Sequence, residues 1–200
     1  MKKLLALSLC FVVIFTFASC GEKKAKSKDS VDLSYYANLG KIPEVSYKLG
    51  ADCEKVEKEL QAEYDAFLAT DPHNSPDHDH DHDVEEIYYN RSDEGDYIFL
   101  NNGSKYFLYK KDQVKKGISC IVTFGDAFGF KMGTFIVDVK KAMPNTKFVE
   151  EEITEGSVFF EEFLSSGTVL KTQVNGVTIM FVFQEGELYC TAMYKTNSWK

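Results

Sequence analysis

The amino-acid sequence is poor in several residue types on which familiar activities depend. Its 200 residues include a single arginine, Arg91, and only four histidines, all between His73 and His82. It contains no Gly-rich phosphate loop, no His-Glu-x-x-His helix and no Gly-x-Ser-x-Gly elbow. A Ser-His or Cys-His nucleophile pair would have to take its base from that one histidine-containing segment. The sequence therefore predicts that the protein is not an enzyme. A glycosidase-like carboxylate pair among Glu150–Glu152 and Glu161–Glu162 is the alternative that stays open.

Cysteine is too scarce for a disulfide framework. Only Cys53, Cys120 and Cys190 follow Cys20, which is an odd number, and no Cys-x-x-Cys pair is present. The pattern favours buried, apolar cysteines, with a Cys120–Cys190 bridge as the one pairing to test.

No N-terminal apolar run is long enough for a membrane-spanning helix, which needs about 20 residues. The run from Leu4 to Phe17 follows two lysines and leads through small residues to Cys20. This order resembles a bacterial lipoprotein signal peptide, which implies removal of residues 1–19 and lipidation of Cys20. We therefore expect a cell-envelope protein, lipid-anchored to a bacterial membrane and facing outside the cytoplasm. Ordinary secretion and a retained anchor are the alternatives.

The net charge excludes another class of partner. The chain carries 23 basic against 31 acidic residues, and loss of residues 1–19 removes two lysines and no acid, so the net charge changes from −8 to −10. This negative charge repels phosphate backbones, and we expect no nucleic-acid partner. Residues 20–34, the lipidated cysteine and a lysine-rich polar segment, are predicted to form a flexible tether that reaches at most ~50 Å.

An internal repeat organises the rest of the chain. The pattern Lys-[Leu/Met]-Gly-x5-Val-x-Lys-x-[Leu/Met] occurs at Lys48–Leu60 and again at Lys131–Met143. Two shorter matches follow in the same order: Asn102-Gly103 with Asn175-Gly176, and Ile118-x-Cys120 with Leu188-x-Cys190. We interpret these matches as a diverged tandem duplication, with a first α+β repeat over residues 35–124 and a second over residues 125–200.

Each repeat is predicted to be a helix followed by an antiparallel β-meander, which makes the fold class α+β. Hydrophobic periodicity predicts a helix over residues 51–69, and Thr134 as N-cap with Pro144 as the stop predicts a shorter one in the second repeat. The Asn-Gly pairs predict hairpins over residues 97–110 and 169–183.

A third strand is expected in each repeat, near residues 118–124 and 188–194. In the second of these, Leu188, Cys190, Ala192 and Tyr194 are predicted to share one face. Residues 177–183 are apolar on both faces, so we expect a central, covered strand. Residues 157–164 fit either a strand or a short helix.

A helix followed by a meander, duplicated in an exported chain, resembles two bacterial modules. These are the β-lactamase-inhibitor-protein-like fold and the small accessory lipoprotein of outer-membrane protein assembly, and the resemblance covers residues 45 to 195. It rests on Gly50 with Val56 and Gly133 with Val139, which match structural positions only. The resemblance implies a protein that binds other proteins through a sheet surface, without catalysis. Tyr88, Tyr89, Tyr106 and Tyr109 belong either to the core or to such an exposed aromatic strip.

The segment 71–83 is an insertion in the first repeat and contains the side chains best suited to bind a metal ion. It interleaves imidazoles with carboxylates, a ligand set that suits zinc. The candidate metal ligands are His73, His78, His80, His82, Asp79 and Asp81. No cofactor is required by the rest of the chain, so zinc is the one cofactor considered. A solvated acidic insertion and a pH-responsive loop are the alternatives.

Overall fold

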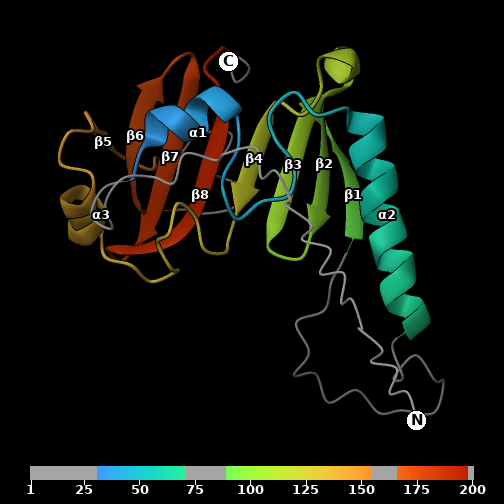
Figure 1. Ribbon diagram of the computed structural model, residues 1–200, viewed down its shortest axis with the longest axis horizontal. Helices are drawn as coiled ribbons and strands as arrows, with labels where there is room; N and C mark the ends of the chain where they lie inside the picture. The colour runs from blue at the N-terminus through green and yellow to red at the C-terminus, as the bar shows by residue number, and fades with distance from the viewer. Residues whose placement is uncertain (1–30, 71–88, 155–165, 198–200) are drawn as a thin grey trace, which may run out of the picture.

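The computed structural model describes residues 31–70, 89–154 and 166–197 (Figure 1). Within these ranges an eight-stranded antiparallel sheet is accompanied by three α-helices and one 3-10 helix, so the predicted α+β class is confirmed. In chain order the elements are α1 (Leu33–Leu39), α2 (Cys53–Thr70), β1 (Tyr89–Glu94), β2 (Tyr97–Asn102), β3 (Lys105–Lys110), η1 (Lys111–Lys116), β4 (Cys120–Thr123), α3 (Ile136–Ala142), β5 (Val149–Glu152), β6 (Thr168–Val174), β7 (Val177–Gln184) and β8 (Glu187–Lys195).

From either edge of the sheet inward, four strands follow one another in chain order. The strand order is β1-β2-β3-β4-β8-β7-β6-β5, so strands β1 to β4 form one meander and β5 to β8 form another. The two meanders join through their last strands, β4 and β8, which pair antiparallel. At this join Val122 pairs with Ala192, and each lies two residues after its cysteine, Cys120 or Cys190.

The chain enters α2 through a turn that is fixed by two backbone hydrogen bonds. Gly50 N–H donates to Ile118 O over 2.7 Å, and Ile118 N–H donates to Ala51 O over 2.8 Å. Gly50 has a φ of +79°, which glycine adopts readily because it lacks a Cβ. Asp52 then caps α2, because its carboxylate accepts the Lys55 N–H over 3.0 Å.

The chain enters α3 through the same turn. Gly133, also at φ +79°, donates to Leu188 O over 2.9 Å, and Leu188 N–H donates to Thr134 O over 2.8 Å. The prediction that Thr134 caps this helix was wrong: its hydroxyl donates to Lys131 O over 2.7 Å, and Phe135 is the N-cap residue without a side-chain bond. The helix ends before Pro144, as predicted, because the residue preceding proline avoids the helical region.

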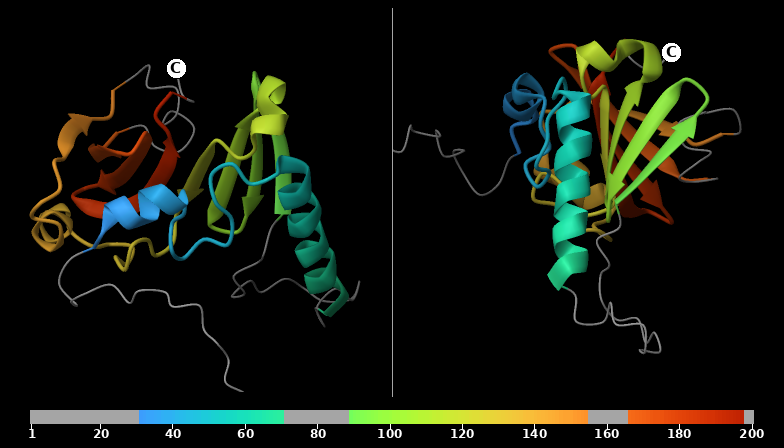
Figure 2. Two further views of the ribbon diagram at one scale, coloured as in Figure 1. Left: turned by 45° about the horizontal axis from the view of Figure 1, so that its top comes forward. Right: turned by 90° about the vertical axis from the view of Figure 1, so that its right-hand side faces the viewer.

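All three α-helices pack on one face of the sheet, which we call the helix side. The right panel of Figure 2 shows α1 and α2 on that side, and Figure 1 shows that α2 extends beyond the ends of the strands. Val56 and Leu60 of α2, together with Val139 and Met143 at α3, are buried in the same cluster as the sheet residues of this face. The predicted hydrophobic stripes are therefore confirmed at these positions.

The α1 helix was not predicted from the sequence. Asp32 caps it by accepting the Tyr35 N–H over 3.1 Å, and Gly40 ends it. It begins at Leu33, so the last two residues assigned to the tether are helical. Of the helices in the described ranges, none is long and apolar enough to cross a membrane.

A side-chain contact links the loop between α1 and α2 to the connection between the two meanders. The Glu44 carboxylate, from the loop between α1 and α2, accepts the N–H groups of Phe128 and Gly129, each over 2.9 Å. Both of these residues have a positive φ in the tight turn over residues 127–130. The loop from the first half of the chain therefore holds the turn that leads into the second half.

One strand prediction needs correction. Tyr189 is an extra residue in β8, because Val182 pairs with Cys190 while Phe183 pairs with Leu188. This bulge turns Leu188 to the helix side, away from the face that Cys190 occupies, so the two do not share a face as predicted. The predicted central strand is confirmed: seven consecutive residues of β7, Val177–Phe183, are buried.

The two hairpin turns also differ from each other. Val174 pairs with Val177, so Asn175-Gly176 forms the predicted two-residue turn with both φ values positive. In the first hairpin Asn102 pairs with Lys105, so the turn consists of Gly103 and Ser104 instead of Asn102-Gly103.

Candidate protein-binding face

The residues singled out for lipidation and metal binding lie outside the described ranges. These are Cys20, His73, His78, His80, His82, Asp79 and Asp81. The predicted alternatives for residues 157–164 also fall outside them. Within residues 31–70, 89–154 and 166–197, no group of three or more His, Cys, Asp or Glu side chains is placed to hold a metal ion.

The second face of the sheet, which we call the open face, carries a separate hydrophobic cluster. Its buried members all belong to strands: Leu108, Cys120, Val122, Val169, Met180, Val182, Cys190 and Ala192. No described helix contributes a residue to this cluster. The open face is therefore built from alternate positions of β3, β4 and β6 to β8, whose other side chains fill the helix-side core.

Aromatic side chains lie over these small and aliphatic residues. Tyr106 on β3 packs edge-to-face on Phe124 with ring centroids 5.5 Å apart, and Phe124 packs in the same way on Tyr189 at 5.3 Å. Phe99 and Tyr194 are partly buried against the same cluster. We call these five residues the aromatic band. It starts on β2 and β3, crosses the β4–β8 join and ends on β8.

The band differs from the strip that the sequence suggested. Tyr109 is 3% exposed in the helix-side core, and Tyr89 packs against that core, while Tyr88 lies outside the described residues. Of the three that the structure describes, Tyr106 alone faces the open side. Sequence reasoning missed Phe124 and Tyr189.

The sequence signal that was available was strand alternation. Phe124 follows Cys120 and Val122 at steps of two, so it belongs to their face. Tyr189 could not be placed by alternation, because the bulge puts it on the same face as its neighbour Cys190.

The cysteines beneath the band are structural. Burial raises the pKa of the Cys120 thiol well above its usual value, and it raises the pKa of the Cys190 thiol to about 12. Both thiols are therefore protonated and poorly nucleophilic at neutral pH. All three cysteines of the described ranges are free and buried, so the predicted burial is confirmed.

A Cys120–Cys190 bridge does not form. Cys120 is paired with Tyr194, which lies four residues along β8 from Cys190. At ~3.4 Å per residue this offset alone exceeds the ~7 Å limit for the Cα atoms of a disulfide.

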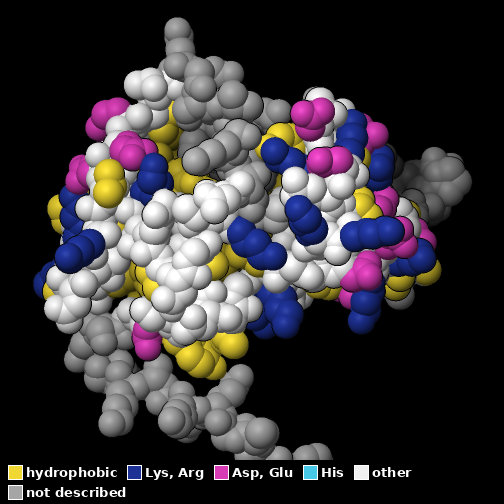
Figure 3. Space-filling model, turned by 90° about the horizontal axis from the view of Figure 1, so that it is seen from above, with side chains coloured by type: hydrophobic (Ala, Val, Ile, Leu, Met, Phe, Trp, Pro, Cys, Tyr) yellow, Lys and Arg dark blue, Asp and Glu magenta, His cyan; other side chains and the backbone are white. Residues whose placement is uncertain are grey.

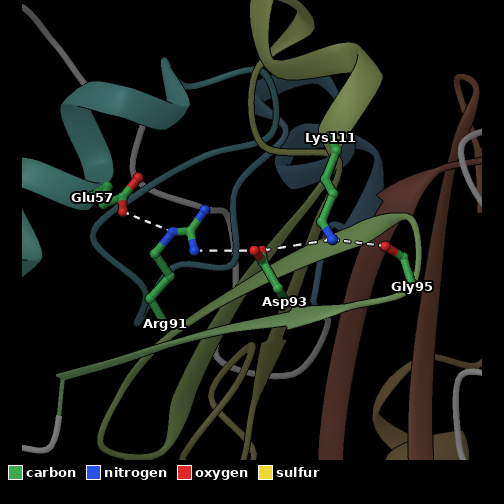
Figure 4. A network of polar contacts seen from close by, with 5 residues as sticks. All are labelled: Glu57, Arg91, Asp93, Gly95 and Lys111. Carbon is green, nitrogen blue, oxygen red and sulfur yellow. Dashed lines mark hydrogen bonds and ion pairs between the residues drawn. The ribbon is translucent and has the colours of Figure 1, made fainter.

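The one arginine takes part in a polar network on the rim of the sheet. Figure 4 shows Arg91 and Asp93 on β1 between Glu57 of α2 and Lys111 of η1. Arg91 Nε lies 3.0 Å from Glu57 Oε1, and its Nη1 lies 3.4 Å from Asp93 Oδ1. Lys111 Nζ lies 3.8 Å from Asp93 Oδ1 and donates to Gly95 O over 2.8 Å.

This network fastens α2 and η1 to the edge of the sheet. Partial burial opposes the charge on Arg91, but Asp93 and Glu57 outweigh it and raise the pKa of the guanidinium. Burial, followed by the Glu57 charge, raises the pKa of Tyr109 to about 12 and also raises that of Tyr89. The four side chains are 31% to 50% exposed, so each pair adds only about 0–1 kcal/mol to stability.

The glutamate run considered for a carboxylate pair lies on the edge strand β5. Glu150 pairs with Lys140, and Glu151 accepts two hydrogen bonds from Lys171, each over 2.9 Å. Glu152 accepts a hydrogen bond from Thr168 over 3.3 Å. These carboxylates therefore have structural partners, and charge on an edge strand discourages pairing with other chains.

A shallow hollow of about 370 Å³ lies against the first half of α2. Its lining is Asp52, Glu54, Lys55, Lys58, Glu59 and Ala62. Acidic and basic side chains are mixed here, and Lys55 lies 3.6 Å from Glu59, as expected of a solvated helix face.

Comparison with known proteins adds no relative: no family model, no curated protein and no solved structure matches this chain.

Proposed function

We propose that the protein is a lipid-anchored, extracytoplasmic binding module, without catalytic activity, that captures another protein on its open face. The observation that carries this proposal is the aromatic band on a sheet face to which no described helix contributes. Aromatic residues are enriched in protein–protein interfaces, because they bury a large area and lose little conformational entropy. The Phe and Tyr side chains of the aromatic band, which pack on small aliphatic residues, have the composition of such an interface.

We also infer that the chain contains two copies of one helix-plus-meander unit. Three observations support this. Four strands follow one another in chain order from each edge of the sheet, the turns at Gly50 and Gly133 have the same hydrogen bonds, and Val122 pairs with Ala192. A helix followed by a meander, present twice, is what the resemblance to the β-lactamase-inhibitor-protein-like fold implies. That resemblance carries the same expectation of a sheet surface that binds protein.

The anchor is proposed from the signal sequence alone. Cys20→Ala should leave the chain unlipidated and incompletely processed. In a detergent phase-partition assay the wild-type protein should enter the detergent phase and the variant should not. Unchanged partition of the variant would refute the anchor, though not the binding face.

The binding face is tested by capture from an envelope extract with the mature, lipidated chain. Tyr189→Ala and Tyr106→Ala each remove one ring of the band, and each should lower recovery of the partner at least about tenfold, the range of an interface hot spot. Phe135→Ala is the matched control, because Phe135 is 52% exposed and caps α3 outside the band. Recovery that falls equally in all three variants, or in none, would contradict the proposal. Thermal melts of each variant separate loss of binding from loss of fold.

Zinc binding by the segment 71–83 is the second candidate function. Its specific support is that all four histidines of the chain lie in this one segment, between α2 and β1. We expect micromolar-class zinc affinity at neutral pH that is mostly lost by about pH 5.5, because protons compete for imidazole near its pKa of about 6.5.

Calorimetry with wild type and a His78/His80/His82→Ala triple variant decides this point, since equal heats would exclude a zinc site. Deletion of residues 71–83 separates the two functions. Partner capture should survive the deletion if the open face is responsible, and should be lost if the segment is.

A further inference from the structure

The α1 helix leaves two large apolar side chains in solvent. Leu33 and Ala37 are buried in the helix-side core, but Tyr35 is 42% exposed and Leu39 is 46% exposed. Because they are four residues apart on a helix, the two side chains are neighbours on its outward side. In Figure 3 hydrophobic side chains project at the lower margin of the view, which is the side of the molecule that α1 occupies.

This helix is also the first element after the proposed lipid anchor. Fully extended, the chain from Cys20 to Val31 reaches at most about 40 Å, so α1 stays close to the membrane surface. The ten residues from Gly21 to Ser30 contain four lysines and two acids, in a chain whose mature net charge is −10. Positive charge next to an anchor is attracted to anionic headgroups, although the protein as a whole is repelled by them.

The position of α1 on the sheet determines which face would point toward the membrane. α1 packs over β6 and β7 on the helix side, whereas the aromatic band lies on the open face. A membrane in contact with α1 therefore leaves the open face turned away from the lipid.

We propose that α1 lies on the bilayer that holds the Cys20 lipid, with Tyr35 and Leu39 in the headgroup region. Tyrosine suits this region because its ring is apolar and its hydroxyl is polar. The contact fixes the orientation of the molecule, so that the helix side faces the membrane and the open face meets soluble or neighbouring proteins. This inference rests on the lipid anchor of the proposed function and adds the surface that meets the lipid.

Lipid-borne quenching of tryptophan fluorescence tests the contact in the full lipidated chain. The single tryptophan is first removed by Trp199→Phe, and one probe is introduced by Tyr35→Trp or, as the control on the open face, by Tyr189→Trp. Each protein is reconstituted on vesicles of phosphatidylethanolamine and phosphatidylglycerol, with or without bromine on the acyl chains. Interfacial side chains sit about 5–10 Å into the headgroup and acyl boundary, so brominated lipid should lower the Tyr35→Trp fluorescence by about half. The Tyr189→Trp fluorescence should stay nearly unchanged.

The outcomes separate this inference from the anchor. Vesicle flotation is measured first, and a chain that does not float overturns the anchor and the inference together. A chain that floats but shows no quenching at Tyr35→Trp overturns the inference alone. If that probe is shielded from dissolved iodide yet not quenched by brominated lipid, a second copy of the protein covers α1 and the inference is wrong. Leu39→Ser should reduce the quenching at Tyr35→Trp, and high salt should reduce it further by screening the lysines.

Discussion

Replacing Gly117 with alanine should destabilise the protein far more than the same change at Gly50 or Gly133, although all three glycines have nearly the same φ. Their φ values are +78°, +79° and +79°. An alanine at positive φ costs roughly 1–2 kcal/mol through strain between its Cβ and its own backbone. Gly117 also has a ψ of −175°, a combination that is essentially restricted to glycine, so its backbone cost should be at least as large as that at the other two sites.

The surroundings of the added Cβ make the difference between the sites larger. At Gly50 it would meet only the end of Lys195, with Nζ 3.6 Å away, and at Gly133 only the end of Glu187, with Oε2 3.8 Å away. At Gly117 it would lie 2.4 Å from the Ala51 carbonyl oxygen and 2.5 Å from the Gly50 carbonyl atoms. These are backbone atoms, so the chain must move, and movement disturbs the hydrogen bonds that fix the turn before α2.

We therefore expect a loss of about 1–2 kcal/mol for Gly50→Ala and for Gly133→Ala, and about 4 kcal/mol or more for Gly117→Ala. Urea unfolding monitored by circular dichroism measures all three on one scale. A Gly117→Ala variant as stable as Gly50→Ala would refute the close approach. Losses at Gly50 and Gly133 that differ by more than about 1 kcal/mol would contradict the equivalence of the two turns.

Three further predictions concern polar and titratable groups. Glu44→Gln should lower the free energy of unfolding by about 1 kcal/mol and Glu44→Ala by about 2 kcal/mol, because the charged acceptor for two N–H groups of the 127–130 turn is weakened or lost. Urea unfolding measures both losses. Equal stability of both variants and wild type would exclude that role. The pKa of Tyr109 is raised to about 12, against about 10 when unfolded, so its contribution to stability should be complete below pH 10 and be lost as the pH rises from 10 to 12. Tyrosinate absorbance should accordingly show late-titrating groups in the folded protein, and Tyr109→Phe should remove one of them, because burial also raises the pKa of Tyr47 to about 12. The thiols of Cys120 and Cys190 should resist a thiol reagent at neutral pH and react fully in denaturant, and rapid reaction of the native protein would mean that the sheet opens at the join.

The larger features could be predicted from the sequence because they depend on local patterns. The 3.6-residue stripe with Val56 and Leu60 predicted α2, and the apolar run of β7 predicted a strand covered on both faces. Gly-x5-Val predicted where both helices begin, since the turn and the first buried valine lie within one short segment.

The features that the sequence did not predict depend on long-range contacts and on an extra residue in a strand, and a local sequence pattern contains neither. The α1 helix is only seven residues long and depends on burial of Leu33 and Ala37 against strands more than a hundred residues away. The bulge at Tyr189 reverses the face of Leu188, and alternation cannot register an extra residue. The aromatic band combines β2, β3 and β8, and only the β4–β8 pairing brings them together.

That pairing also governs how the protein can fold. Two-residue turns join β1 to β2, β2 to β3, β6 to β7 and β7 to β8, and hairpins of this kind close within microseconds. The β4–β8 join instead brings together segments separated by most of the second half of the chain, so its loop-closure entropy must be overcome before the contact forms. We therefore expect this join to form later than the hairpins on either side of it. Because the aromatic band crosses it, the proposed binding surface comes into existence only at that step, and a nascent or truncated chain that holds one meander does not carry it.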